Sequence, residues 1–168
     1  MSRQIVLACL AVAALTANAN AQSLPAEGPV SVTFTGTQTA PAKSMSIGSG
    51  KEYRVVNYAM TGSNDAGNPI LDSMGGRCQL SQVIDTPAKT METHGYCTYV
   101  DKDGDQIFEK CDGVPGGPTN CKLTGGTGKF DGLQADLAIT VKPLKSNYEG
   151  IDQMIGQKKG TYKIVKTN

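Results

Sequence analysis

The chain has no tryptophan and very few of the residue types on which catalytic centres depend. Its 168 residues include three phenylalanines and a single histidine, His94. A Ser-His-Asp triad or a Cys-His dyad would have to use this histidine, but no Gly-x-Ser-x-Gly motif accompanies it. We interpret His94 as an exposed residue, and we assign no catalytic residue and no cofactor from the sequence.

The ligand spacing of a zinc site and the sequence of a phosphate-binding loop are also missing. The chain has no Cys-x-x-Cys pair and no second histidine. In the glycine-rich run from Gly125 to Gly132, Lys129 is followed by Phe130 and then by a predicted strand. A phosphate loop requires Ser or Thr after its lysine and then a helix. The run is therefore interpreted as structural.

The chain also has no excess of positive or negative charge. Lys and Arg together number 16, and Asp and Glu number 15. The one local basic pair, Lys158-Lys159, is interpreted as part of a solvated turn. Proteins that bind nucleic acid carry clustered basic residues for the phosphate backbone. The sequence therefore predicts no nucleic-acid partner.

The N-terminal segment has the pattern of an export signal. Arg3 precedes an apolar stretch from Ile5 to Leu15, which is too short to span a bilayer. Ala19-Asn20-Ala21 supplies small residues for a signal peptidase, so residues 1–21 are predicted to be removed, with cleavage after Ala19 as the alternative. We expect a periplasmic or secreted protein.

Val6-Leu7-Ala8-Cys9 resembles a lipoprotein signal, but too few residues precede Cys9. We therefore expect no membrane anchor. Residues 22–29 are expected to form a loose N-terminal segment, and residues 30–168 a single domain.

Four cysteines follow the leader: Cys78, Cys97, Cys111 and Cys121. An even number in an exported chain predicts disulfide bonds. We favour the pair 78–97, which joins consecutive predicted strands, and the pair 111–121, which closes a loop rich in glycine and proline. A hairpin centred on Gly104 would instead place Cys97 opposite Cys111 and leave 78–121.

Helical periodicity of useful length is absent after the leader, and alternation of apolar and polar residues takes its place. The clearest case runs from Leu133 to Lys142, with Ala138 as its one lapse. Many short strands separated by glycine turns are typical of antiparallel barrels and sandwiches. The predicted strands cover residues 30–35, 53–60, 78–84, 95–100, 106–111, 133–142 and 161–165.

A corner motif precedes the clearest strand and favours the barrel. It places four glycines around one aromatic residue, and glycine is used where the backbone needs a positive φ or a close approach. We expect the aromatic ring to fill one end of the barrel. The motif consists of Gly125, Gly126, Gly128, Phe130 and Gly132.

Three carboxylates at alternate positions, Asp101, Asp103 and Asp105, are the candidates for a cation site. Hard cations such as calcium prefer several oxygen ligands close together. However, an EF-hand loop requires its glycine at the sixth position, and Gly104 stands at the fourth. Asp-Gly is also a favoured dipeptide in hairpin turns. We favour a plain hairpin tip and no metal.

Tyrosine is the most abundant aromatic residue, with six copies. Tyrosines that point into a barrel would form an apolar pocket with polar groups, which is the usual shape of a small-ligand site. Ordinary strand positions with the hydroxyl at the surface are the alternative. The six are Tyr53, Tyr58, Tyr96, Tyr99, Tyr148 and Tyr162.

The corner motif, the strand after it and the closing Gly160-Thr161-Tyr162 resemble the allene oxide cyclase and dirigent-like barrels of the calycin type. The resemblance extends to an exported bacterial branch of that group. It implies an all-β fold, a closed antiparallel eight-stranded barrel, and trimeric assembly. Because the catalytic residues of the family have no matching motif here, no catalytic residue is carried over.

Three functions follow as hypotheses. The first is an exported, non-catalytic barrel that binds a small apolar molecule, and it is the one we favour. The second is a cyclase-like or coupling-guiding enzyme. The third is a structural or interaction module whose barrel is filled by side chains. An interior cavity with convergent polar groups would favour the first two, and two buried, unpaired acids would favour the enzyme.

Overall fold

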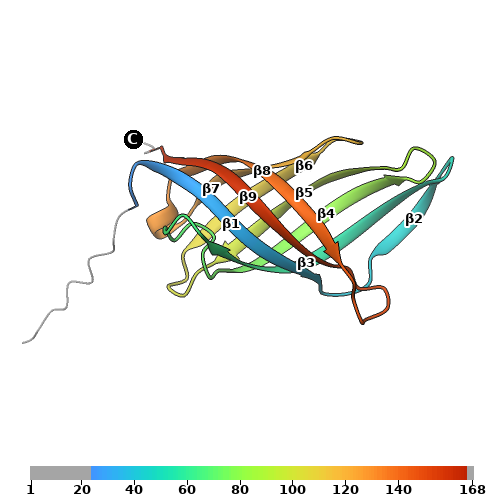
Figure 1. The fold of residues 1–168 in the computed structure, drawn as a ribbon, viewed down its shortest axis with the longest axis horizontal. Coiled ribbons are helices and arrows are strands. Elements are labelled where there is room, and N and C mark those ends of the chain that lie inside the picture. Colours follow the sequence, from blue (N-terminus) through green and yellow to red (C-terminus); the bar gives the residue numbers. More distant parts are fainter. Residues whose placement is uncertain (1–23, 166–168) are drawn as a thin grey trace, which may run out of the picture.

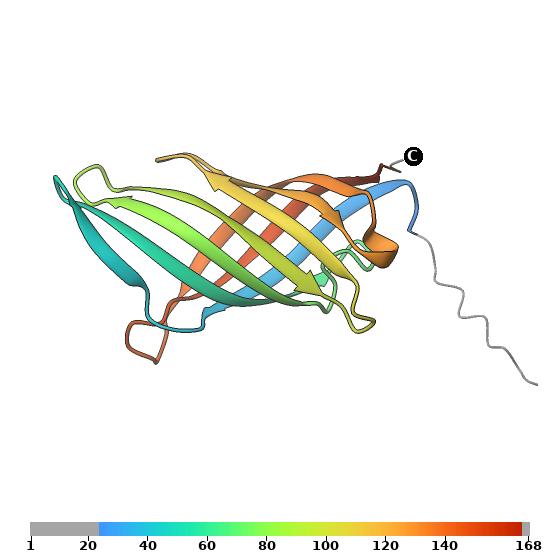
Figure 2. The same cartoon turned by 180° about the vertical axis from the view of Figure 1, so that it is seen from behind.

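The computed structural model describes residues 24–165, which form a closed antiparallel β-barrel (Figure 1). The predicted leader lies outside these residues. Eight strands close the barrel because β1 pairs with both β9 and β3, while β2 pairs with β3 outside it (Figure 2). The strands are β1 (Glu27–Gln38), β2 (Lys43–Gly48), β3 (Lys51–Asn64), β4 (Gly75–Asp85), β5 (Thr90–Val100), β6 (Gln106–Gly113), β7 (Thr119–Gly126), β8 (Leu133–Leu144) and β9 (Gln153–Ile164).

Alternation along the strands separates the interior of the barrel from its surface. In β8, Leu133, Ala135 and Leu137 are buried, and the residues between them are exposed. In β1, Val30, Val32 and Phe34 turn inward in the same way. This period of two is the signal from which the fold was predicted, and the closed antiparallel barrel is confirmed.

One end of the barrel is filled. The β3–β4 loop places Ile70, Leu71 and Met74 in the core, and the short 3-10 helix η1 (Gly128–Phe130) buries Phe130 completely. In Figure 1 this loop and η1 lie at the same end of the barrel. Asn64 holds the loop in place, because its side-chain amide donates to Ile70 O at 2.7 Å. The aromatic ring of the corner motif therefore fills a barrel end, as predicted.

The corner motif requires glycine where the chain leaves η1 for β8. Gly132 has a φ of +74°, and a Cβ atom on it would lie 2.2 Å from Val165 O. A larger residue would therefore be strained both by its backbone conformation and by contact with the C-terminal end of β9.

Two disulfides join directly opposed residues of neighbouring strands, Cys78 with Cys97 across β4–β5 and Cys111 with Cys121 across β6–β7. This is the favoured pairing. The alternative hairpin register is not adopted, because Cys97 stands opposite Glu109. Disulfides of this kind fit an oxidising compartment. Within residues 24–165, no helix has the length and apolar character needed to cross a bilayer.

Several strands differ from the prediction: β2 was not predicted, and β5 begins at Thr90, five residues before its predicted start. β1 begins at Glu27, so residues 27–29 belong to the barrel and not to a loose segment. β7 was not predicted, although Cys121 and Leu123 alternate inward along it. β9 begins at Gln153, eight residues before the predicted start, and two glycines within it had obscured the pattern.

The interpretation of Lys158-Lys159 as a solvated turn is wrong. Both residues lie within β9, and Lys158 is only 2% exposed. Gly156, two residues before Lys158, also lies within β9. Glycine is needed there because β9 runs close to β8: a Cβ atom would lie 2.3 Å from Thr140 O. The glycine therefore marks a close approach of two strands and not a turn.

Candidate functional site: the barrel cavity

The end of the barrel opposite η1 contains a cavity of about 420 Å³. This volume falls within the range of small-molecule sites, roughly 300–1,000 Å³. Its wall is mainly apolar and comes from all eight strands of the barrel, and residues near the strand ends, such as Met91, Leu144 and Gln153, form its mouth. The main apolar wall residues are Phe34, Tyr58, Met60, Leu80, Ile139 and Met154.

An ion pair within a hydrogen-bonded cluster forms part of the cavity lining. Lys158 Nζ on β9 lies 2.6 Å from Glu109 Oε1 and 2.5 Å from Oε2 on β6, and 2.9 Å from the Tyr99 hydroxyl on β5. The Tyr99 hydroxyl in turn donates to Glu109 Oε2 at 2.9 Å. The side chains of Lys158 and Glu109 are 2% and 0% exposed. Two buried opposite charges therefore meet inside an otherwise apolar barrel.

The cluster satisfies its own polar atoms. The three N–H donors of a lysine have three acceptors here, and the single tyrosine donor has one. Two rings also face the ammonium: the centroids of Phe34 and Tyr99 lie 5.3 Å and 5.1 Å from Nζ. Burial, and then the Glu109 charge, hold the pKa of Tyr99 well above its usual value, so this hydroxyl stays protonated as a donor.

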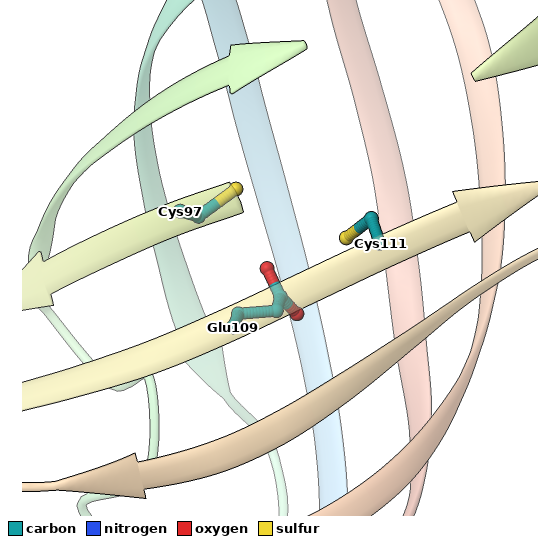
Figure 3. A group of neighbouring side chains, drawn as sticks. All are labelled: Cys97, Glu109 and Cys111. Atoms are coloured by element: carbon teal, nitrogen blue, oxygen red, sulfur yellow. The ribbon is translucent and has the colours of Figure 1, made fainter. Parts of the chain in front are cut away.

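Figure 3 shows Glu109 between two cysteines, Cys97 and Cys111. The ligand atoms of the three residues lie within 4.8 Å of one another, a spacing that a metal site would also have. Both sulfurs belong to disulfides, however, and a metal requires thiolates. This donor set therefore does not fit a metal, and the disulfides serve as cavity wall.

Arg54 on β3 adds a second cation to the cavity lining. Its Nε donates to Gln82 Oε1 at 2.6 Å, which fixes the orientation of the guanidinium. Nη1 lies 3.6 Å from Asp152 Oδ2, beyond hydrogen-bonding distance, and the Asp152 side chain is 56% exposed. Among residues 24–165, the two Nη atoms donate to no acceptor within hydrogen-bonding distance.

The six tyrosines divide between the two interpretations of the sequence. Tyr58, Tyr99 and Tyr162 are buried, Tyr53 is half-buried, and Tyr96 and Tyr148 are 65% and 71% exposed. Tyr58 contributes to the cavity wall, and its hydroxyl has no hydrogen-bond partner within the described part of the chain. Burial, followed by the charge of Asp152, raises the pKa of Tyr58, and Arg54 opposes this effect.

The three aspartates of the β5–β6 turn lie outside the cavity and hold a lysine. Lys129 Nζ lies 2.9 Å from Asp103 and 3.7 Å from Asp105, and it also pairs with Asp101. Asp101 Oδ1 accepts the backbone N–H groups of Asp103 and Asp105 and so shapes the hairpin tip. Hydrogen bonds from Lys102 and Lys129 lower the pKa of Asp103 to about 2. The lysine of the corner motif therefore takes the place that a cation would occupy.

His94 lies on the outer surface of β5, with its side chain 48% exposed. Its ring nitrogens lie 2.9 Å from Asp112 and 2.7 Å from Glu92. Hydrogen bonds to Glu92 and then Asp112 raise its pKa above the ordinary 6.5. The predicted exposure is confirmed, and this histidine is not among the cavity residues.

A larger hollow of about 660 Å³ lies over β7, β8 and β9. Exposed polar side chains contribute much of its lining, among them Lys122, Asp136 and Thr161. Its volume includes a wide opening to solvent, so a ligand there would remain largely hydrated. The barrel cavity, with its buried polar groups, is the better candidate site.

Sequence reasoning did not identify Lys158, Glu109 or Arg54 as site residues. For Glu109 a signal was present, because Ile107, Glu109 and Cys111 occupy alternate positions of one predicted strand. A carboxylate in line with an inward-facing cysteine predicts a buried acid. Arg54 and Lys158 lacked such a signal.

The fold and the cavity define the class: a small closed antiparallel barrel with an internal cavity. No family model matches the chain, and no curated protein matches it.

Proposed function

We propose that this protein binds a small, mainly apolar molecule inside its barrel and acts by binding, without turnover. One observation carries the proposal: a cavity of about 420 Å³ with an apolar wall and a few fixed polar groups. Burial of apolar surface supplies the free energy of binding in such a site, and the polar groups select the ligand.

The alternative of a structural module with a filled barrel has less support. Ile70, Leu71, Met74 and Phe130 fill one end of the barrel, but the interior near the other end is hollow. A barrel that needed only stability would gain from packing side chains throughout.

A cyclase-like or coupling-guiding enzyme would be favoured by two buried, unpaired acids. Among residues 24–165, Glu109 is the one buried carboxylate, and Lys158 neutralises it. Both of its carboxylate oxygens accept from Lys158, so it is not an unpaired acid. The binding hypothesis is therefore preferred.

The eight-stranded barrel and its corner motif support the proposed relationship to the allene oxide cyclase and dirigent-like group. That relationship is the basis for proposing a homotrimer. The disulfides, together with the predicted leader, are the basis for proposing a periplasmic or secreted location.

The binding function is tested by native mass spectrometry of protein purified from its own host, together with titration of a fluorescent apolar probe, 1-anilinonaphthalene-8-sulfonate. We expect saturable binding of one probe per barrel. Ile139→Trp, which fills the cavity, should weaken binding at least about tenfold. Thr140→Trp, on the outer face of the same strand, is the matched control and should leave it unchanged.

Equal binding by both variants would place the probe outside the barrel. Absence of both a co-purifying ligand and saturable probe binding would refute the proposed function.

A further inference from the structure

The polar groups of the cavity fall into two sets that differ in how fully they are paired. Lys158, Glu109 and Tyr99 satisfy one another. Within residues 24–165, the Nη atoms of Arg54 and the hydroxyl of Tyr58 donate to no acceptor. The Arg54 side chain is 22% exposed and lines the cavity, so a ligand there that carries an acceptor can bond to its Nη donors directly in place of water.

The fixed orientation of Arg54 adds geometry to this requirement. Gln82 engages Nε, which leaves the Nη edge of the guanidinium available. Two parallel N–H groups at such an edge match the two oxygens of a carboxylate. Asp152 compensates part of the charge but is too distant for a hydrogen bond and is half exposed to solvent. It therefore balances part of the charge of Arg54 without occupying its donors.

From these contacts we propose that the barrel binds an apolar molecule that ends in a carboxylate, with the carboxylate at Arg54 and Tyr58 and the apolar body against Phe34, Met60, Leu80 and Ile139. This ligand class rests on the proposed binding function. The self-paired Lys158–Glu109 cluster offers no unpaired donor to an anion and acts as a fixed part of the wall.

The experiment compares three ligands of equal length, octanoate, octanamide and 1-octanol, by isothermal titration calorimetry at pH 7 with the mature protein. We expect octanoate to bind at least about tenfold more tightly than octanol, because hydrogen bonds to charged groups are the stronger ones. Arg54→Gln should abolish this preference and leave octanol binding unchanged. Arg54→Lys, which keeps the charge without the planar fork, should retain part of it.

Arg77→Gln is the matched control, because Arg77 is exposed on β4 and its substitution changes the net charge by the same amount. Circular dichroism establishes that each variant is folded. Equal affinity for octanoate and octanol, or a preference that survives Arg54→Gln, would overturn the proposed ligand class while the binding function stands. If none of the three ligands binds, the binding function itself fails, and the ligand class fails with it.

Discussion

Lys158 on β9 and Glu109 on β6 form an ion pair across the barrel interior, between strands separated in the sheet by β7 and β8. Backbone pairing alone connects each strand to its neighbours. This contact connects two strands that are not neighbours, and it does so where both side chains are buried. It therefore fixes the distance across the barrel at the depth of the cavity.

Loss of one partner of this pair should be costly, and loss of both should not. Lys158→Met leaves the Glu109 carboxylate buried without its cation, and we expect it to lower the free energy of unfolding by about 3–5 kcal/mol. The double variant Lys158→Met/Glu109→Met should be no less stable than the native protein. Urea unfolding monitored by circular dichroism measures both. Equal destabilisation by the single and double variants would contradict this account.

The two disulfides should differ in their contribution to stability. Cys78–Cys97 encloses a sequence separation of 19 residues and Cys111–Cys121 one of 10. Each is expected to contribute about 2–4 kcal/mol, and the longer loop about 0.5 kcal/mol more, because it restricts the unfolded chain more strongly. Paired Cys→Ala variants, compared by urea unfolding, measure the difference. Peptide mapping without reduction checks the pairing, and a 97–111 bridge would show that it is wrong.

Much of the fold followed from the sequence, because period-two alternation and glycine turns are local signals. The β8 pattern and the pairing of the cysteines are of this kind. The site was mostly missed, because the direction in which a charged side chain points depends on strand register. Arg54 lies in a segment with apolar residues on both faces, and Lys158 stands beside a second lysine. Partners distant in the sequence, Gln82 and Glu109, settle where each points.

His94 offers a direct test of the surface electrostatics, because it is the chain's one histidine. Its folded-state pKa is raised above 6.5 by Glu92 and Asp112. Protonated His94 therefore stabilises the fold below pH 6.5, and the contribution is lost as the pH rises through the raised pKa. Proton NMR should give a pKa above 6.5 in the native protein and a lower one in Glu92→Gln. A pKa at or below 6.5 would contradict the two contacts.

Calcium should bind weakly at the Asp101–Asp105 turn, because Lys129 already neutralises its carboxylates. We expect a dissociation constant of about millimolar or weaker in the native protein. Lys129→Gln removes the competing ammonium and should tighten calcium binding about tenfold, whereas Asp103→Ala should abolish this gain. Calorimetric titration measures all three. Micromolar binding by the native protein, abolished by Asp103→Ala, would instead establish a calcium site.

Asp152 should weaken, not assist, the binding of a carboxylate at Arg54. It lies 3.6 Å from Nη1 and carries the same charge as the proposed ligand group. Asp152→Asn removes that repulsion, so we expect octanoate to bind about three- to tenfold more tightly while octanol is unaffected. The gain should shrink as salt is added, because Asp152 is largely exposed and its charge is screened. Calorimetry at about 0.05 and 0.5 M salt measures both effects. Weaker octanoate binding in Asp152→Asn would mean that the aspartate orients Arg54 for its ligand and does not compete with it.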